Sequence, residues 1–161
     1  MRTLTTFLTA ALFSVTLLTA CAAQDIDAPQ ATLPQSPLVV ETANGPVMLT
    51  VELADDPHEV RTGMMFRQQI GDDEGMLFDM ERPHEVFFWM HNTLIPLDII
   101  FIAEDGHIHR IAANSPRLSD ALIPSSGTTL GVLEIGSGRA AALGIEVGDL
   151  VRHPLFGNAP N

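Results

Sequence analysis

The chain contains no lysine, and it has a single cysteine and a single tryptophan among its 161 residues. Because Cys21 is the only cysteine, an internal disulfide is impossible in any redox compartment. The lack of lysine leaves eight arginines against 20 acidic residues, and the formal net charge at pH 7 is −12. Such a surface repels phosphate backbones, so the composition argues against a nucleic-acid-binding protein.

Two nucleophilic chemistries are also missing. No Gly-x-Ser-x-Gly motif occurs, and Ser125-Ser126-Gly127 is typical of a simple turn. The only thiol, at Cys21, lies in an N-terminal targeting signal, which leaves none for the folded domain. The acidic run Asp72-Asp73-Glu74 lacks the ligand spacing of an EF-hand and indicates a charged turn. Serine, thiol and calcium chemistry therefore find no support.

The N-terminus has the pattern of a bacterial lipoprotein signal. A basic start precedes the apolar stretch Leu4–Leu18, and the segment ends in a Leu-Thr-Ala-Cys lipobox at Cys21. This stretch is short for a transmembrane helix, which needs about 20 apolar residues. We therefore expect residues 1–21 to form a signal peptide with lipidation at Cys21. Cleavage after Ala22, which would give a simple secreted protein, and an uncleaved anchor are the alternatives.

This signal predicts a place in the cell envelope. A lipid on Cys21 would attach the protein to a membrane on the periplasmic side, and Ala22 favours the outer over the inner membrane by analogy with enterobacterial lipoproteins. The segment 22–37, with three prolines and no aromatic residue, predicts a disordered tether. We place the folded domain at 38–155 and a C-terminal tail at 156–161.

The hydrophobic pattern of the domain predicts mainly strands. Asn44-Gly45 is a hairpin signal, and the following strand, Val47–Leu53, alternates apolar and polar residues, so one of its faces should be buried. The further strands that we expect are Leu38–Thr42, Gly75–Met80, Glu85–His91, Leu97–Ala103, His107–Ala113, Thr129–Ile135 and Leu150–His153.

Two short helices complete the pattern. Asp56 should cap the first helix, with Pro57 in its first position and Glu59 closing a capping box. Ser137 should cap the second helix, Gly138–Leu143. About seven strands and two short helices, without strand–helix alternation, predict a mainly β (α+β) domain, small, antiparallel and barrel-like.

The run Glu85–Phe101 is the most apolar and aromatic part of the chain after the signal, and it holds Trp89. We expect its first part, Glu85–His91, to be a central strand that is covered on both faces. Four polar side chains interrupt the run, namely His91, Asn92, Thr93 and Asp98. Buried polar groups need partners, so the run is either a polar network that fixes the fold or the floor of a binding site.

Of these four residues, Asp98 has the strongest need for a partner, because a carboxylate in an apolar strand needs a cation or several hydrogen-bond donors. We expect Arg67 as its partner, since arginine forms bidentate pairs with carboxylates. In the structural hypothesis this pair only fixes the fold. In the functional hypothesis a ligand pocket with an aromatic wall is formed by Arg67, Trp89, His91, Asn92 and Asp98.

Metal binding has weaker support. His107 and His109 lie two residues apart on an expected strand, so they share a face and could chelate Zn or Cu. No third ligand is fixed by spacing, and a solvated hairpin face is the simpler interpretation. Five methionines could attract Cu(I), although such residues more often fill a core: Met64, Met65, Met76, Met80 and Met90. We expect no cofactor.

Five segments match a known family in order and spacing: Gly63–Arg67, Glu74–Phe78, Phe88–Thr93, Leu94–Phe101 and Leu143–Asp149. Over Val51–Val151 the chain resembles the DUF192 (UPF0127) family, a domain of unknown function found in bacteria and archaea. The resemblance implies a small β-rich barrel that is often exported or lipid-anchored, and it implies no reaction. Some relatives carry two cysteines in the loop corresponding to Asn114–Gly127, where this chain has none.

The sequence thus favours a non-enzymatic, lipid-anchored envelope protein that binds a small molecule, a peptide or an envelope component. A hydrolase- or lyase-type enzyme with Asp98 or His91 as general base is one alternative, and a periplasmic metal-binding protein is another. The geometry of the site distinguishes the binding protein from the enzyme. An open pocket that holds Trp89, His91 and Asp98 would support the enzyme, whereas a sealed Asp98–Arg67 pair would exclude it.

Overall fold

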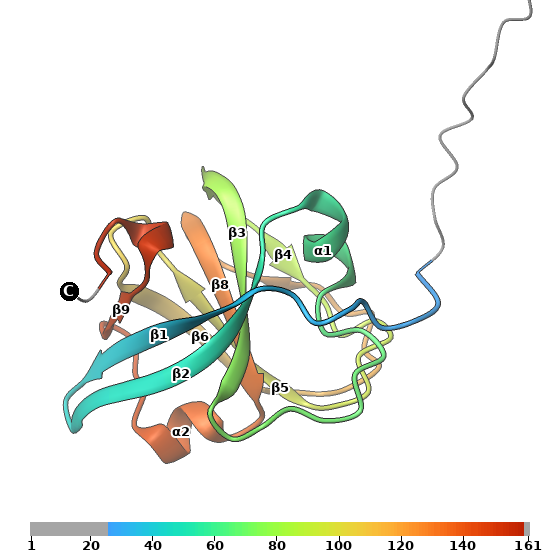
Figure 1. Ribbon diagram of the computed structural model, residues 1–161, viewed down its shortest axis with the longest axis horizontal. Coiled ribbons are helices and arrows are strands. Elements are labelled where there is room, and N and C mark those ends of the chain that lie inside the picture. Colours follow the sequence, from blue (N-terminus) through green and yellow to red (C-terminus); the bar gives the residue numbers. More distant parts are fainter. Residues whose placement is uncertain (1–25, 160–161) are drawn as a thin grey trace, which may run out of the picture.

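The computed structural model describes residues 26–159, so the predicted signal peptide and Cys21 lie outside the described residues. Seven strands form the main sheet: β1 (Gln35–Thr42), β2 (Gly45–Ala54), β3 (Glu74–His84), β5 (Leu97–Ile102), β6 (Ile108–Ser115), β8 (Thr129–Gly136) and β9 (Leu150–Arg152). Their order is β6-β5-β8-β3-β2-β1-β9, and the sheet curls into an open half-barrel (Figure 1).

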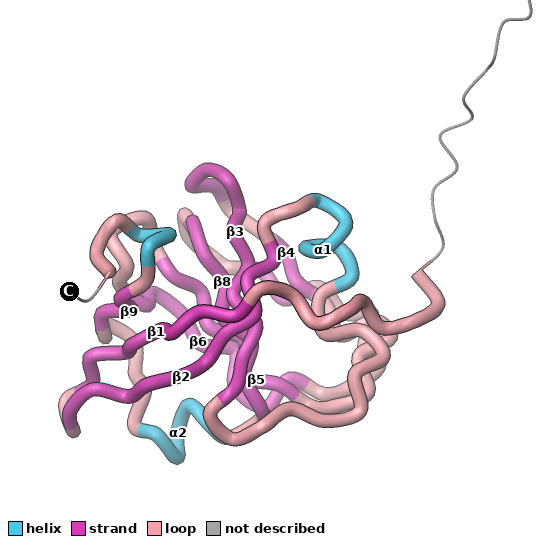
Figure 2. Tube along the Cα trace, in the orientation of Figure 1, coloured by secondary structure: helices cyan, strands magenta, loops and turns pink. Residues whose placement is uncertain are grey.

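The smaller elements surround this sheet. A second sheet pairs β4 (Phe87–Phe88) with β7 (Ile123–Pro124). Two helices, α1 (Pro57–Thr62) and α2 (Arg139–Leu143), and the 3-10 turn η1 (Pro154–Phe156) complete the domain. The connections 63–73, 89–96 and 116–122 gather on one side, where backbone hydrogen bonds join them (Figure 2).

The predicted mainly β domain with two short helices is confirmed, with two differences in the sheet. The pair β2–β3 is parallel, so the sheet is mixed rather than wholly antiparallel. The edge strands β6 and β9 meet only at one end, through the isolated bridge between His107 and Leu150. The pattern of alternation showed the strands but could not show whether the sheet closes.

The N-terminal cap of α1 is the one that the sequence predicts, and the N-terminal cap of α2 is not. The Asp56 carboxylate accepts a hydrogen bond from the His58 N–H at 2.8 Å, and the Glu59 carboxylate accepts one from the Asp56 N–H at 3.3 Å. The capping box is therefore confirmed. The predicted Ser137 cap is wrong, because α2 has Gly138 at its N-cap with a φ of 78° and no side-chain cap.

The centre of the main sheet is buried on both faces. Successive side chains of a strand point to opposite faces, and β3, β5 and β8 alternate between two apolar clusters. On the face packed by α2, the α2 face, lie Leu38, Val40, Leu49, Val51, Leu77, Ile100, Ile102, Ile108, Leu133, Ile135, Ala140, Ile145, Val151 and Phe156. On the opposite α1 face lie Ala54, Met64, Met76, Phe78, Val86, Met90, Leu97, Ile99, Phe101 and Val132.

Glu85–His91 is not the central strand that the sequence predicted. Only Phe87 and Phe88 are extended into a ladder, and they pair with β7 outside the main sheet. The segment lies over the α1 face instead, with Val86 and Met90 buried against the sheet and Trp89 43% exposed. Its inner part, Val86–Met90, is apolar at every position and gives no indication of which side chains face solvent, and this caused the error.

The predicted Asp98–Arg67 pair is also wrong. Asp98 is fully buried on the α2 face, because its neighbours Leu97 and Ile99 point to the α1 face. Its Oδ1 accepts a hydrogen bond from the Asn114 N–H at 2.8 Å, and its Oδ2 accepts one from the Ala140 N–H at 2.9 Å. Ala140 is in the first turn of α2, so Asp98 satisfies the helix end that Gly138 leaves uncapped.

The structure extends the domain at both ends. Within the predicted tether 22–37, the Gln30 side chain donates to the Gly63 carbonyl at 3.0 Å, and the Leu33 N–H donates to a carboxylate of β2 at 2.8 Å. At the other end Phe156, which the sequence assigned to the tail, packs into the α2-face cluster. Between residues 26 and 159, no helix has the length and apolarity needed to cross a membrane.

Replacement of Asp98 by Ala should destabilise the domain by more than about 2 kcal/mol, because the buried Ala140 N–H and the partly buried Asn114 N–H lose their acceptor. Urea unfolding measures this difference. The exposed Asp55→Ala variant is the matched control and should stay within about 0.5 kcal/mol of wild type. A wild-type midpoint for Asp98→Ala would contradict the capping role.

Candidate functional site

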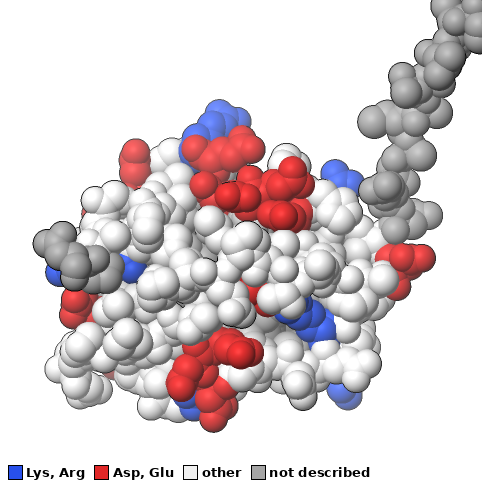
Figure 3. All heavy atoms as spheres, viewed as in Figure 1, with Lys and Arg blue, Asp and Glu red and all other residues white. Residues whose placement is uncertain are grey.

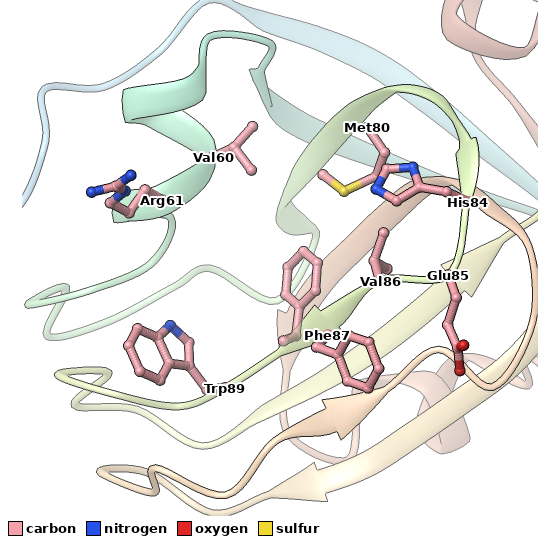
Figure 4. Close-up of a pocket in the computed structure, with 9 residues that line it drawn as sticks. Val60, Arg61, Met80, His84, Glu85, Val86, Phe87 and Trp89 are labelled. Carbon is pink, nitrogen blue, oxygen red and sulfur yellow. The ribbon is translucent and has the colours of Figure 1, made fainter.

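A surface pocket of about 420 Å³ opens on the α1 face between α1, the far end of β3 and the segment that follows it. In Figure 4, Val60 and Arg61 come from α1, and Met80 and His84 come from β3 on the other side. Trp89 forms a further wall beneath Arg61. The complete lining is Val60, Arg61, Met80, His84, Glu85, Val86, Phe87, Phe88 and Trp89.

A narrower cavity of about 30 Å³ adjoins this pocket, and the two share Val60, Arg61, Phe88 and Trp89. Its other lining residues are Thr62, Gly63, Met64, Met65, Phe78, Thr93 and Glu134. The space holds little more than one water-sized group. We call this cavity the deep extension of the wide pocket, because the shared residues place it beside the pocket and because Phe78 and Glu134 of the main sheet line it.

Glu134 is the only acidic residue that lines the deep extension. It lies on β8 between Leu133 and Ile135, which point to the α2 face, so its own side chain points to the α1 face. The residue is 4% exposed, and its carboxyl has no hydrogen-bond partner within residues 26–159. Burial raises the pKa of Glu134 to about 8. The group is therefore mainly protonated at neutral pH.

A second carboxylate of the same sheet face shows the contrast. Glu52 and Glu134 are both in register with Met76, one on each neighbouring strand. The Arg67 guanidinium binds Glu52 through two hydrogen bonds of 2.6 and 2.8 Å. The Leu33 N–H adds a third. Glu52 is thus fully paired, whereas Glu134 faces a cavity without a partner, which is a frequent property of functional carboxyls.

His91 contacts Trp89 and pairs with Asp120. The rings of Trp89 and His91 stack with centroids 4.8 Å apart at 25°. The His91 Nδ1 lies 2.6 Å from the Asp120 Oδ1, and the side chains of His91 and Asp120 are 42% and 77% exposed. An exposed pair of this kind adds little stability. Its evident effect is to fix the imidazole against the Trp89 wall.

Only part of the predicted site is brought together. Trp89 lines both parts of the pocket, and His91 stacks on it without lining either part. Asn92 adopts a left-handed conformation with a φ of 53°, and its carbonyl accepts a hydrogen bond from the Phe66 N–H. Arg67 and Asp98 lie outside the lining, the one paired with a carboxylate of β2 and the other buried on the α2 face.

The sequence contained an unused signal for Glu134. A carboxylate between Leu133 and Ile135 in an apolar strand meets the same criterion that singled out Asp98. Val60 and Met80 offered no such signal, because their meeting across the pocket depends on tertiary structure.

The predicted metal residues have other partners. The His107 Nδ1 lies 3.2 Å from an Asp105 carboxylate oxygen, and the His109 Nε2 lies 2.9 Å from the Thr129 hydroxyl. Burial lowers the pKa of His109. The part of the chain that the structure describes holds no group of three or more His, Cys, Asp or Glu that could bind a metal. Three of the five methionines, Met64, Met76 and Met90, pack in the α1-face cluster.

The fold is that of a small, mainly β half-barrel domain. Residues 39–153 match the DUF192 family, described as "Uncharacterized ACR, COG1430", and the chain belongs to this family. No curated protein matches the chain.

Similar solved structures include the following two. One is a protein from Sinorhizobium meliloti 1021 described as a candidate transcription regulator, with 38% identity, a TM-score of 0.75 and coverage of 78% of this chain and 98% of that chain. The other is a protein of unknown function from Novosphingobium aromaticivorans DSM 12444, with 42% identity, a TM-score of 0.75 and coverage of 82% and 94%.

Glu134 should make the stability of the domain depend on pH. Its pKa is about 8 in the folded state against 4.5 for the free side chain, so the folded protein holds a proton that the unfolded chain has lost. The free energy of unfolding should therefore fall as pH rises from 4.5 to 8, by on the order of 4 kcal/mol from this group.

The Glu134→Gln variant should lose this part of the pH dependence. Urea unfolding of both proteins between pH about 5 and about 8.5 isolates the contribution as a difference, in which the titration of histidines cancels. If wild type and variant keep a constant difference across this range, the pKa of Glu134 is not raised.

Proposed function

We propose that this protein is a non-enzymatic binding module that takes a small molecule, or a side chain of a peptide or envelope component, into the α1-face pocket. The observation that carries the proposal is the preformed pocket with a buried, unpartnered carboxyl at its base. Ligand sites are typically concave, mostly apolar and furnished with a few polar groups that fix orientation.

The lining supports this proposal. A volume of about 420 Å³ lies within the range of small-molecule sites. Val60, Met80, Phe88 and Trp89 provide apolar and aromatic surface from three separate parts of the chain. Trp89 remains 43% exposed, as a wall that a ligand could cover. An exposed aromatic side chain beside a pocket favours binding, since its burial by a ligand is favourable.

DNA regulation is not part of the proposal. The description of the Sinorhizobium protein as a candidate transcription regulator belongs to that protein. This chain has a formal net charge of −12, which opposes binding to phosphate backbones. On the face shown in Figure 3, acidic groups gather over α1 and the tip of β3 and again beside α2, with few basic groups between them.

The proposal includes a location in the cell envelope. The lipobox at Cys21 supports attachment to a membrane through an N-terminal lipid, on the periplasmic side and with the outer membrane favoured. The acidic surface gives no attraction to anionic lipids, so the attachment depends on the lipid anchor.

A hydrolase- or lyase-type enzyme is the second candidate, and its support is the His91–Asp120 pair. A carboxylate at 2.6 Å from Nδ1 orients an imidazole in the way that a general base requires. Asp98 does not serve as the base, because both of its oxygens accept backbone hydrogen bonds on the α2 face.

Val60→Arg should abolish binding of an aromatic probe such as 2-phenylethanol, because the longer side chain fills the pocket. The chain has one Trp and no Tyr, so intrinsic fluorescence reports on Trp89 alone. Wild type should show a saturable change in emission, and Val60→Met should show a weaker one. Val147→Arg, at a 60% exposed position outside the pocket, is the control and should bind as wild type does. Equal binding by all four proteins would place the probe elsewhere.

Replacement of Cys21 by Ala should release the protein from membranes when it is expressed with its own signal in a bacterial host. Intact mass of the wild-type protein should show acyl groups, and the variant should show none. The address is wrong if the variant still fractionates with membranes and the wild-type mass carries no lipid.

A further inference from the structure

We infer that Glu134 recognises a primary amino group, so that the pocket binds an amine with an apolar body. This inference rests on the proposed function and adds the chemical class of the ligand. The apolar part would lie against Trp89, Val60 and Met80 in the wide pocket. The amino group would enter the deep extension and meet the carboxyl at its base.

The size of the deep extension limits what can reach Glu134. About 30 Å³ admits a compact group such as an ammonium but leaves no room for a ring or a branched head. The carboxyl lacks a protein hydrogen bond within the described chain, and its oxygens are not among the fully buried unpaired atoms, so they are open to the cavity. An incoming group that donates hydrogen bonds would remove this deficit.

The surroundings of Glu134 favour a cation over a neutral or anionic group. Phe78, Phe88 and Trp89 line the extension, and aromatic rings attract ammonium groups. An ammonium also forms a charge-assisted hydrogen bond with a carboxylate, which is stronger than the bond to an alcohol. A carboxylate ligand would place a second acidic group beside Glu134.

The other charged groups nearby are few. From α1, Arg61 lines both parts of the pocket, and it would repel an ammonium unless the ligand carries an anionic group for it. His84 and Glu85 belong to the wide pocket only. Two strands away on the same face of the sheet, Glu52 is paired with Arg67, so their charges balance. Glu134 is therefore the one acidic group available to a cation in the deep extension.

Amine binding at this carboxyl should release a proton. Below a pH of about 8 the free protein holds Glu134 as a neutral acid, and pairing with an ammonium requires the carboxylate. The proton leaves to solvent when the ion pair forms. Affinity for an amine should therefore rise with pH until Glu134 is ionised in the free protein, whereas affinity for the matching alcohol should not.

Phenethylamine and 2-phenylethanol test this inference, because they differ only in the amino and hydroxyl groups. Binding is followed by Trp89 emission in wild type, in Glu134→Gln and in the exposed control Glu146→Gln. Between pH of about 6.5 and about 8.5, wild type and Glu146→Gln should gain roughly 20-fold in affinity for the amine. Glu134→Gln should show no such gain and no preference for the amine, while it still binds the alcohol.

The outcomes separate the two proposals. If both probes bind wild type with equal, pH-independent affinity, the inference about Glu134 is overturned and the binding module stands. A preference for the amine that persists in Glu134→Gln also overturns it, because another group must then recognise the ammonium. If neither probe binds wild type, both proposals fail. Chemical-shift perturbation at the amides of β8 and the segment 85–89 checks that each probe occupies this pocket.

Discussion

Burial of the centre of the main sheet on both faces is the constraint on which the rest of the structure depends. The buried parts of β3, β5 and β8 alternate between two apolar clusters, so a polar side chain there needs a partner inside the protein. Asp98 finds two backbone N–H groups and thereby fixes the start of α2. Glu52, on the neighbouring β2, finds Arg67. Glu134 finds none, and the structure leaves a cavity beside it.

Elements that depend on local signals could be predicted from the sequence. The turn at Asn44-Gly45 and the capping box at Asp56 need only neighbouring residues, and both occur in the structure. The parallel pair β2–β3 could not be predicted, because pairing depends on contacts between distant parts of the chain. Glu85–His91 was assigned to the sheet interior because Val86–Met90 is apolar throughout, whereas in the structure the segment covers the sheet and Trp89 is 43% exposed.

The candidate site was predictable only where one residue carried the signal. Trp89 stood out as the single Trp, and Asp98 was correctly seen to need donors, but its position on β5 directs it away from Arg67. The same reasoning applied to Glu134 would have identified a buried carboxyl. It could not have shown whether that carboxyl is paired, because the partners of a strand residue come from α1 and from loops whose places the sequence does not define.

An unpaired buried carboxyl has a consequence for the fold as well as for binding. Above a pH of 4.5, holding Glu134 in its apolar surroundings costs folding free energy, which a well-packed apolar side chain at this position on β8 would not. A ligand that supplies the missing partner binds only the folded state, so it stabilises that state by mass action. Asp98 and Glu134 thus show two ways in which one sheet accommodates a buried acid. Backbone N–H groups satisfy the carboxylate of Asp98 permanently. The carboxyl of Glu134 is left open to a partner from outside the described chain.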